Sequence, residues 1–194
     1  NARWGILVTD AKTGKTVYEH NADQLFAPAS VTKLYSCAAA LIALGADHRF
    51  ETPVYQRGND LILVAKGDLT LGGRTLKDGK MAFADDDHIY AAASKTTTEL
   101  TNTDPLAGLK DLARQVKAAG IKEVKGDVLV DTRLFESALG SGSGPGLVTP
   151  ILVNDNIVDV IVKPGAKAGE PATYELRPAT DFVHVDVQVN TVTE

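Results

Sequence analysis

Cysteine is nearly absent from this sequence, since Cys37 is the only one among 194 residues. A framework of disulfide bonds is therefore excluded, while the redox compartment is left open. Cys37 begins the longest apolar stretch, CAAALIALGA, where we expect it to be a small buried side chain. The stretch is too short to span a bilayer, so it predicts a core helix instead of a transmembrane segment.

An excess of basic residues is also lacking. The chain has 20 Lys and Arg against 25 Asp and Glu, a net charge of −5, with no long run of one sign. Binding of nucleic acid through a basic patch is therefore disfavoured. No signal peptide precedes RWGILVTD, so the protein is expected to be either cytosolic or already processed.

Metal-ligand spacing is missing as well. His20, His48 and His184 have no partner at a distance along the chain that suggests a metal site. The run DDDH at 85–88 could bind a hard cation, but a solvated acidic loop is the favoured interpretation, because metal sites need convergent ligands.

The composition is otherwise that of a globular protein, with 44% hydrophobic and 23% charged residues. Two strand hairpins are predicted, one over 4–20 and one after Phe50, separated by an apolar helix from about Ser30 to Gly45. The stretch 104–120 predicts an amphipathic helix that belongs to a β–α–β-like unit ending near Asp131. Its apolar face comprises Leu106, Leu109, Leu112, Ala113 and Val116.

The glycine- and serine-rich stretch at 140–146 predicts a loop or a domain crossing. Strands are expected after it, including 182–189, where valines alternate with polar residues. The fold class is therefore α/β in the broad sense, or α+β.

The stretch PASVTK places Ser30 and Lys33 three residues apart at the start of the first helix. Residues with this spacing share a helix face, so the lysine amine can reach the serine hydroxyl. A serine needs a base to become a nucleophile, and a lysine serves only where burial or nearby charge favours its neutral form. The apolar sequence of the helix that follows predicts that this helix is nearly fully buried and that Lys33 is not freely solvated.

A plainer interpretation of the same residues is a helix cap. Serine is a favoured N-cap, and S-x-x-K occurs often by chance. The pattern alone therefore leaves both interpretations open.

The residues around this stretch resemble the active-site region of penicillin-binding proteins and serine β-lactamases. The resemblance is carried by a D-x-x-T-G-x-x-x-Y-x-x-N hairpin pattern followed by P-A-S-x-x-K. These are Asp10, Thr13, Gly14, Tyr18, Asn21, Pro28, Ala29, Ser30 and Lys33. Later stretches, among them LILVAKGDLTL and LARQVKAAGIKEVKGDVLVD, are similar to low-molecular-mass class C penicillin-binding proteins, the penicillin-binding protein 4 type.

This resemblance implies a domain plan. Residues 1–52 would begin a β-lactamase/transpeptidase-like catalytic domain, interrupted by inserted domains. Residues 53–76 and 146–194 would form an inserted strand-rich domain, and 77–145 a smaller nested α/β domain.

The resemblance also implies two further motifs, S-x-N and a downstream K-T-G. No serine of this chain has asparagine two places on, and the only K-T-G, at 12–14, precedes the nucleophile in the first hairpin turn. We interpret it as a turn and reject Lys12 as catalytic. The chain is therefore expected to be an N-terminal fragment that holds half of a site; a processed half or a degenerate relative are the alternatives.

The function implied by the resemblance is a serine-type D-alanyl-D-alanine carboxypeptidase/endopeptidase that acts on peptidoglycan through an acyl-enzyme. Ser30 would be the nucleophile and Lys33 its base. The expected partners are the stem peptide ending in D-Ala-D-Ala and β-lactams as covalent inhibitors; no cofactor is implied. Such a protein would be exported to the bacterial periplasm or cell envelope. The alternatives are a non-catalytic peptidoglycan-binding or penicillin-sensing module, and a β-lactamase or esterase of the same superfamily.

Overall fold

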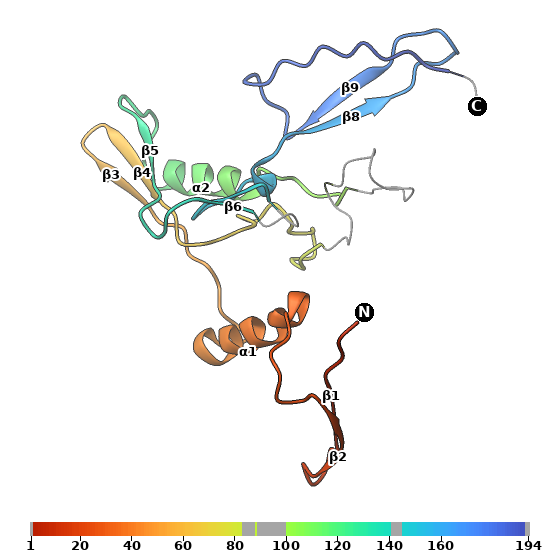
Figure 1. Ribbon diagram of the computed structural model, residues 1–194. Coiled ribbons are helices and arrows are strands. Elements are labelled where there is room, and N and C mark those ends of the chain that lie inside the picture. Colours follow the sequence, from red (N-terminus) through yellow and green to blue (C-terminus); the bar gives the residue numbers. More distant parts are fainter. Residues whose placement is uncertain (1, 83–87, 89–99, 141–144, 193–194) are drawn as a thin grey trace. The chain divides into compact units, whose positions relative to one another are not determined.

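The computed structural model describes residues 2–82, 88, 100–140 and 145–192. The chain forms two compact units, Asn1–Arg49 and Phe50–Glu194. In the described ranges, short sheets and two α-helices give a mixed α+β structure, which confirms the predicted class (Figure 1). Among the described residues, no helix has the length and apolar character needed to cross a membrane.

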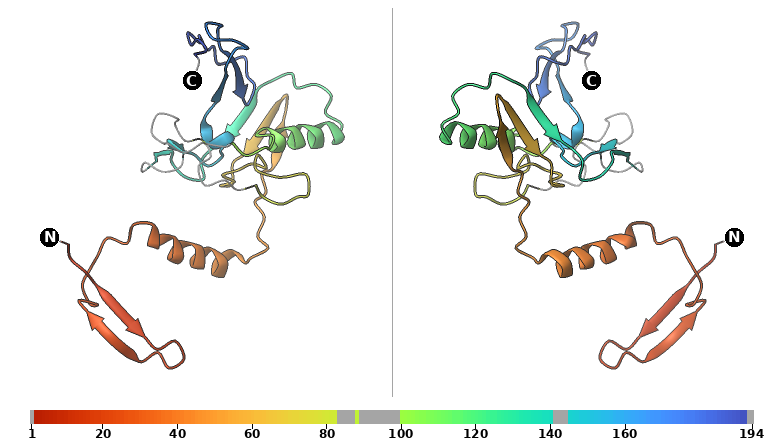
Figure 2. Two further views of the ribbon diagram at one scale, coloured as in Figure 1. Left: turned by 90° about the vertical axis from the view of Figure 1, so that its right-hand side faces the viewer. Right: turned by 90° about the vertical axis from the view of Figure 1, so that its left-hand side faces the viewer.

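The first unit begins with the predicted hairpin. Strand β1 (Ile6–Thr9) pairs antiparallel with β2 (Thr16–His20), with Ile6 opposite His20. At the turn, Gly14 has a φ of 70°, a left-handed conformation that glycine adopts without steric cost. A turn at 21–24 and a short irregular segment then lead to the 3₁₀-helix η1 (Ala29–Val31) and to α1 (Thr32–Leu44) (Figure 2). As predicted, α1 ends at Gly45, whose N–H donates to the carbonyl oxygen of Leu41 at 3.0 Å.

The prediction that α1 is buried nearly all round is wrong for this unit. No residue of α1 is buried, and the side chains of Leu34 and Ile42 are 72% and 88% exposed. Cys37 is exposed as well, contrary to the expectation of a buried thiol. An apolar sequence requires burial but cannot supply the surface that buries it, and the described residues of the unit offer α1 no such surface.

The second unit contains the β–α–β arrangement that the sequence predicts. Strands β3 (Val54–Arg57) and β4 (Asp60–Val64) form the second hairpin, and β5 (Val128–Asp131) adds to β4 in parallel. Between β4 and β5 the chain forms α2 (Ala107–Ala118), which lies against the sheet (Figures 1 and 2). Parallel neighbours need such a crossover connection, because a tight turn can join only antiparallel strands.

The apolar face of α2 and one face of the sheet border a common groove of about 660 Å³. Its lining includes Leu109, Leu112 and Val116 from α2, and Leu61 and Leu63 from β4, which are both buried. The apolar residues of α2 recur with the helical period and therefore share the face that is directed towards the sheet. The sequence predicts this single apolar face.

The remainder of the second unit is built from short pairs. Strands β6 (Ala138–Leu139) and β7 (Leu147–Val148) pair across the glycine-rich stretch, of which 141–144 lie outside the described residues. After the 3₁₀ turn η2 (Asn154–Asn156), β8 (Asp159–Lys163) pairs antiparallel with β9 (Thr173–Arg177). The prediction of a strand over 182–189 is wrong, because none of these residues belongs to a strand. Alternation of apolar and polar residues does not by itself provide a neighbour to pair with.

The predicted division of the second part of the chain into domains stays a prediction.

Gly108, in the first turn of α2, approaches the 68–73 loop closely. A Cβ at this position would overlap the carbonyl oxygen of Leu71 and lie 2.7 Å from its carbonyl carbon. Alanine normally stabilises a helix by about 1 kcal/mol relative to glycine. We expect Gly108→Ala to lower the free energy of unfolding instead, by about 1–3 kcal/mol, because backbone must move to admit the methyl group. Chemical denaturation measures the change, and increased stability would contradict the close approach.

Candidate active site at Ser30 and Lys33

Ser30 and Lys33 form the pair that their spacing predicts. The Nζ of Lys33 donates a hydrogen bond to the Oγ of Ser30 at 2.9 Å. Ser30 lies in η1 and Lys33 in the first turn of α1, so the pair occupies the point where one helix continues into the other. The distance is within the range expected of a nucleophile and the base that activates it.

The cap interpretation of Ser30 is wrong. The N-cap residue of α1 is Val31, that of η1 is Pro28, and neither cap makes a side-chain hydrogen bond. Ser30 is a helical residue inside η1, and its hydroxyl accepts from Lys33. The serine oxygen is therefore directed to the lysine and not to the end of the helix.

The residue before the serine has an unusual backbone. Ala29 has a φ of 44°, in the left-handed region that a residue with a Cβ adopts only at an energetic cost. Such conformations are concentrated at functional sites, where the surrounding structure holds them. The strained residue is therefore next to the candidate nucleophile.

The surroundings of the pair differ from the expectation. Both Ser30 and Lys33 are exposed, so the described residues of the first unit do not enclose them. The sequence predicted a Lys33 shielded by a buried helix, and this shielding is absent from residues 2–49 of the structure.

The K-T-G triplet is confirmed as a turn. The Oδ1 of Asp10 accepts hydrogen bonds from the N–H and the hydroxyl of Thr13, both at 2.8 Å, and from the N–H of Lys12 at 3.1 Å. These bonds stabilise the charged carboxylate and lower the pKa of Asp10, the Thr13 N–H most strongly. The triplet's polar groups thus close the turn between β1 and β2.

Within the described part of the chain, no group of three or more His, Cys, Asp or Glu side chains could hold a metal ion. Of the DDDH run, residues 85–87 lie outside the described residues. His88 is described and belongs to a different arrangement.

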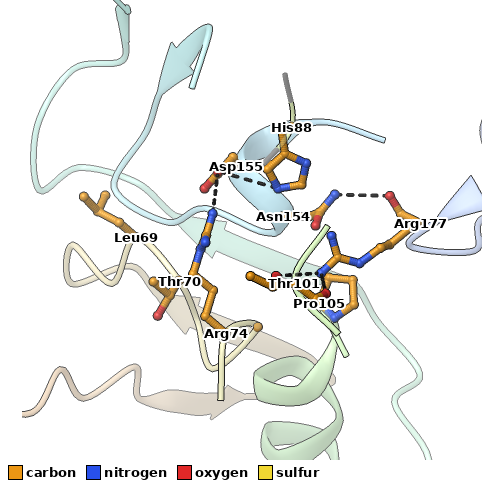
Figure 3. Close-up of a pocket in the computed structure, with 10 residues that line it drawn as sticks. Leu69, Thr70, Arg74, His88, Thr101, Pro105, Asn154, Asp155 and Arg177 are labelled. Atoms are coloured by element: carbon orange, nitrogen blue, oxygen red, sulfur yellow. Dashed lines mark hydrogen bonds and ion pairs between the residues drawn. The ribbon is translucent and has the colours of Figure 1, made fainter. Parts of the chain in front are cut away.

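This arrangement is a charged cluster in the second unit that sequence analysis missed (Figure 3). The Nδ1 of His88 lies 2.6 Å from Asp159 Oδ1, and its Nε2 lies 3.7 Å from Asp155 Oδ2. Arg74 forms an ion pair with Asp155 at 3.2 Å, and Arg177 lies 3.6 Å from Asp159. These contacts join residues up to 81 positions apart, so no local pattern could have revealed them.

The turn η2 shapes one side of the cluster. Asn154, Asp155 and Asn156 all have positive φ, a conformation that Asn and Asp tolerate better than other residues with a Cβ. The Nδ2 of Asn154 donates to Asp159 and to the carbonyl oxygen of Arg177. The triplet N-D-N was the one sequence signal that could have indicated this turn.

The cluster is suited to holding chain segments together. Its two arginines face two aspartates, and Arg177 also donates to the carbonyl oxygen of Thr101 at 2.9 Å. The cavity between these side chains measures about 10 Å³, room for about one water molecule. Because a peptide substrate cannot enter that space, Ser30 and Lys33 are the stronger candidate for chemistry.

Comparison with known proteins identifies the family. A family model described as the D-Ala-D-Ala carboxypeptidase 3 (S13) family matches residues 1–193. The chain belongs to this family. The match includes the hairpin, Ser30 and Lys33, and continues through the second unit as far as residue 193.

Two relatives of this S13 family chain bear names of the same kind. A D-alanyl-D-alanine carboxypeptidase of Actinomadura sp. (strain R39) is 29% identical over 211 residues, which cover 94% of the chain and 32% of that relative. The carboxypeptidase DacB of Mycolicibacterium smegmatis (strain ATCC 700084 / mc(2)155) is 33% identical over 142 residues, covering 72% of the chain and 25% of the relative. The chain thus spans about a third or less of the length of these curated relatives.

Proposed function

We propose that the full-length protein is a serine-type D-alanyl-D-alanine carboxypeptidase/endopeptidase that acts on peptidoglycan, with Ser30 as its nucleophile. The observation that carries the proposal is the 2.9 Å hydrogen bond between Lys33 Nζ and Ser30 Oγ at the start of α1. Membership of the S13 family supports the reaction class. The resemblance to class C penicillin-binding proteins of the penicillin-binding protein 4 type supports the finer assignment.

The proposed reaction is an acyl transfer in two steps. Lys33, in its neutral form, takes the proton of Ser30, whose oxygen attacks the carbonyl carbon between the two terminal D-alanines. The C–N bond breaks, the leaving D-alanine takes the proton back, and water then hydrolyses the ester on Ser30. The backbone N–H of Ser30, in the first helical turn, is the proposed donor to the oxyanion.

This role requires that the pair be covered when substrate is bound, because Lys33 is exposed in the first unit. A lysine becomes a base only where the charged form is disfavoured. Other parts of the protein, or the substrate itself, would supply the cover. We further propose that β-lactams acylate Ser30 because they imitate the D-alanyl-D-alanine end, and that the protein is exported to the cell envelope, where peptidoglycan lies.

A non-catalytic peptidoglycan-binding or penicillin-sensing module is the second candidate. It is favoured by the absence of S-x-N from the 194 residues and by the position of the only K-T-G in a turn.

One experiment separates the two candidates. The full-length protein is incubated with a labelled penicillin and digested, and the adduct is located by peptide mass. A parallel reaction follows release of D-alanine from a peptide ending in D-Ala-D-Ala. We expect one adduct, on the peptide that contains Ser30, together with D-alanine release. Intact protein without adduct and without D-alanine release would favour the peptidoglycan-binding module. An adduct without D-alanine release would favour the penicillin-sensing module.

A further inference from the structure

The segment that delivers Ser30 is tied to the residues that precede β1. The Nδ2 of Asn21 donates to the carbonyl oxygen of Trp4 at 3.0 Å, and the Nε2 of Gln24 donates to the Oδ1 of Asn21 at 3.3 Å. The guanidinium of Arg3 donates to Gln24 and lies 5.6 Å from the centre of the Phe26 ring, within the range of a cation–π contact. Residues 21–26 are therefore held against residues 3–5 by side-chain contacts.

Gly5 makes the closest of these approaches. A Cβ built on Gly5 would overlap Cε2 of Phe26 and would lie 2.8 Å from Cζ and 3.0 Å from Cδ2. Gly5 is not among the glycines with positive φ, so alanine could adopt its backbone conformation. In this arrangement the ring of Phe26, a residue that is 41% exposed, occupies the space that a side chain at position 5 would take. The neighbouring Leu25, by contrast, is 96% exposed.

The backbone between Phe26 and Ser30 is restricted in conformation at three residues. Pro28 has its φ fixed by the ring, and a proline also restricts the backbone of the residue before it, Ala27. Ala29 is held in the left-handed region. We therefore expect a shift of the Phe26 backbone to reach Ser30.

We propose that Gly5 and Phe26 together are positioning residues for Ser30: the ring of Phe26, seated on the bare backbone of Gly5, sets where the segment presents the nucleophile. This inference rests on the proposed function. Neither residue touches the reacting atoms, and both act through the placement of the Ser30 hydroxyl. A displacement on the order of 1 Å at a reacting group can cost about 100-fold in rate.

The test measures acylation of the full-length protein by a labelled penicillin over a range of concentrations. This separates the rate constant of acylation from the dissociation constant of the initial complex. We expect Gly5→Ala to lower the acylation rate constant by about 10- to 100-fold, with the dissociation constant and the thermal unfolding midpoint little changed. Gly146→Ala is the matched control, because a Cβ there meets no atom within 4 Å, and it should acylate like the wild type.

Three further variants test the contact from the side of the ring. Phe26→Leu in the Gly5→Ala background should restore much of the rate, because the smaller side chain leaves room for the methyl group. Phe26→Ala alone should slow acylation about tenfold, and adding Gly5→Ala to it should change little, since contacting residues are not additive. If Gly5→Ala fails to fold, the acylation rate constant of Phe26→Ala alone tests the proposal. A Phe26→Ala variant that acylates at the wild-type rate would overturn it.

The outcomes also separate this inference from the proposed function. A wild-type protein that takes up no label would overturn the proposed function and the positioning role with it. Normal labelling of Ser30 in the wild type and an equal rate in Gly5→Ala would overturn the positioning contact alone, because the Phe26 ring would then have swung aside without consequence.

Discussion

Full-length protein with Ser30 replaced by alanine is expected to lose covalent labelling by penicillin, with the acylation rate falling at least about 10³-fold. The substitution removes the one oxygen that lies 2.9 Å from Lys33 Nζ, and no ester can form without it. D-alanine release should fall in parallel. The measurement is mass spectrometry of the intact protein after a fixed time with the labelled compound.

Ser36→Ala is the control for this variant. Ser36 is on the same helix, and its hydroxyl donates to the carbonyl oxygens of Thr32 and Lys33 and not to the Lys33 amine. We expect it to label as the wild type does. Label that persists in Ser30→Ala at the wild-type rate would show that another residue is the nucleophile.

The second large effect is expected at Lys33. Lys33→Arg keeps a cation and a hydrogen-bond donor beside Ser30, but arginine is effectively always protonated and cannot accept the serine proton. We expect acylation to fall by about 10²- to 10⁴-fold, the usual contribution of a general base. Stopped-flow or quenched labelling over time gives the rate constant, and circular dichroism checks the fold.

Lys12→Arg is the matched substitution in the first hairpin. Lys12 belongs to the K-T-G triplet, which the structure places in the turn between β1 and β2, where its N–H donates to Asp10. Its acylation rate should equal that of the wild type. A loss as large as that of Lys33→Arg would mean that the turn lysine takes part in catalysis after all. A wild-type rate in Lys33→Arg would exclude Lys33 as the base.

Local features of the fold followed from the sequence because neighbouring residues determine them. Gly14 and Gly45 are at the turn and the helix end where positive φ is required. Asp104 accepts from the N–H of Leu106 just before α2, as its predicted place at the helix start suggests. The contact between Ser30 and Lys33 belongs to the same class, because residues three apart on a helix meet regardless of the rest of the fold.

Features that need a partner from elsewhere in the chain were less predictable. The apolar composition of α1 indicated burial, yet Leu34 and Ile42 are exposed, since burial depends on which surface comes to cover a helix. The alternation in 182–189 indicated a strand, yet a strand exists only where a neighbour accepts its hydrogen bonds. Both predictions inferred a tertiary relation from a local pattern.

The sequence by itself determined the candidate nucleophile and its base, because helix geometry alone brings Lys33 to Ser30, and the family follows from the pattern around them. Only the tertiary structure showed that Ser30 is not a cap, that its Oγ accepts from the lysine, and that Phe26 rests on Gly5. It also brought Arg74, His88 and Asp159 into one charged cluster. Backbone propensity and spacing act over a few residues, whereas contacts between residues 17 to 81 positions apart depend on how the folded chain packs.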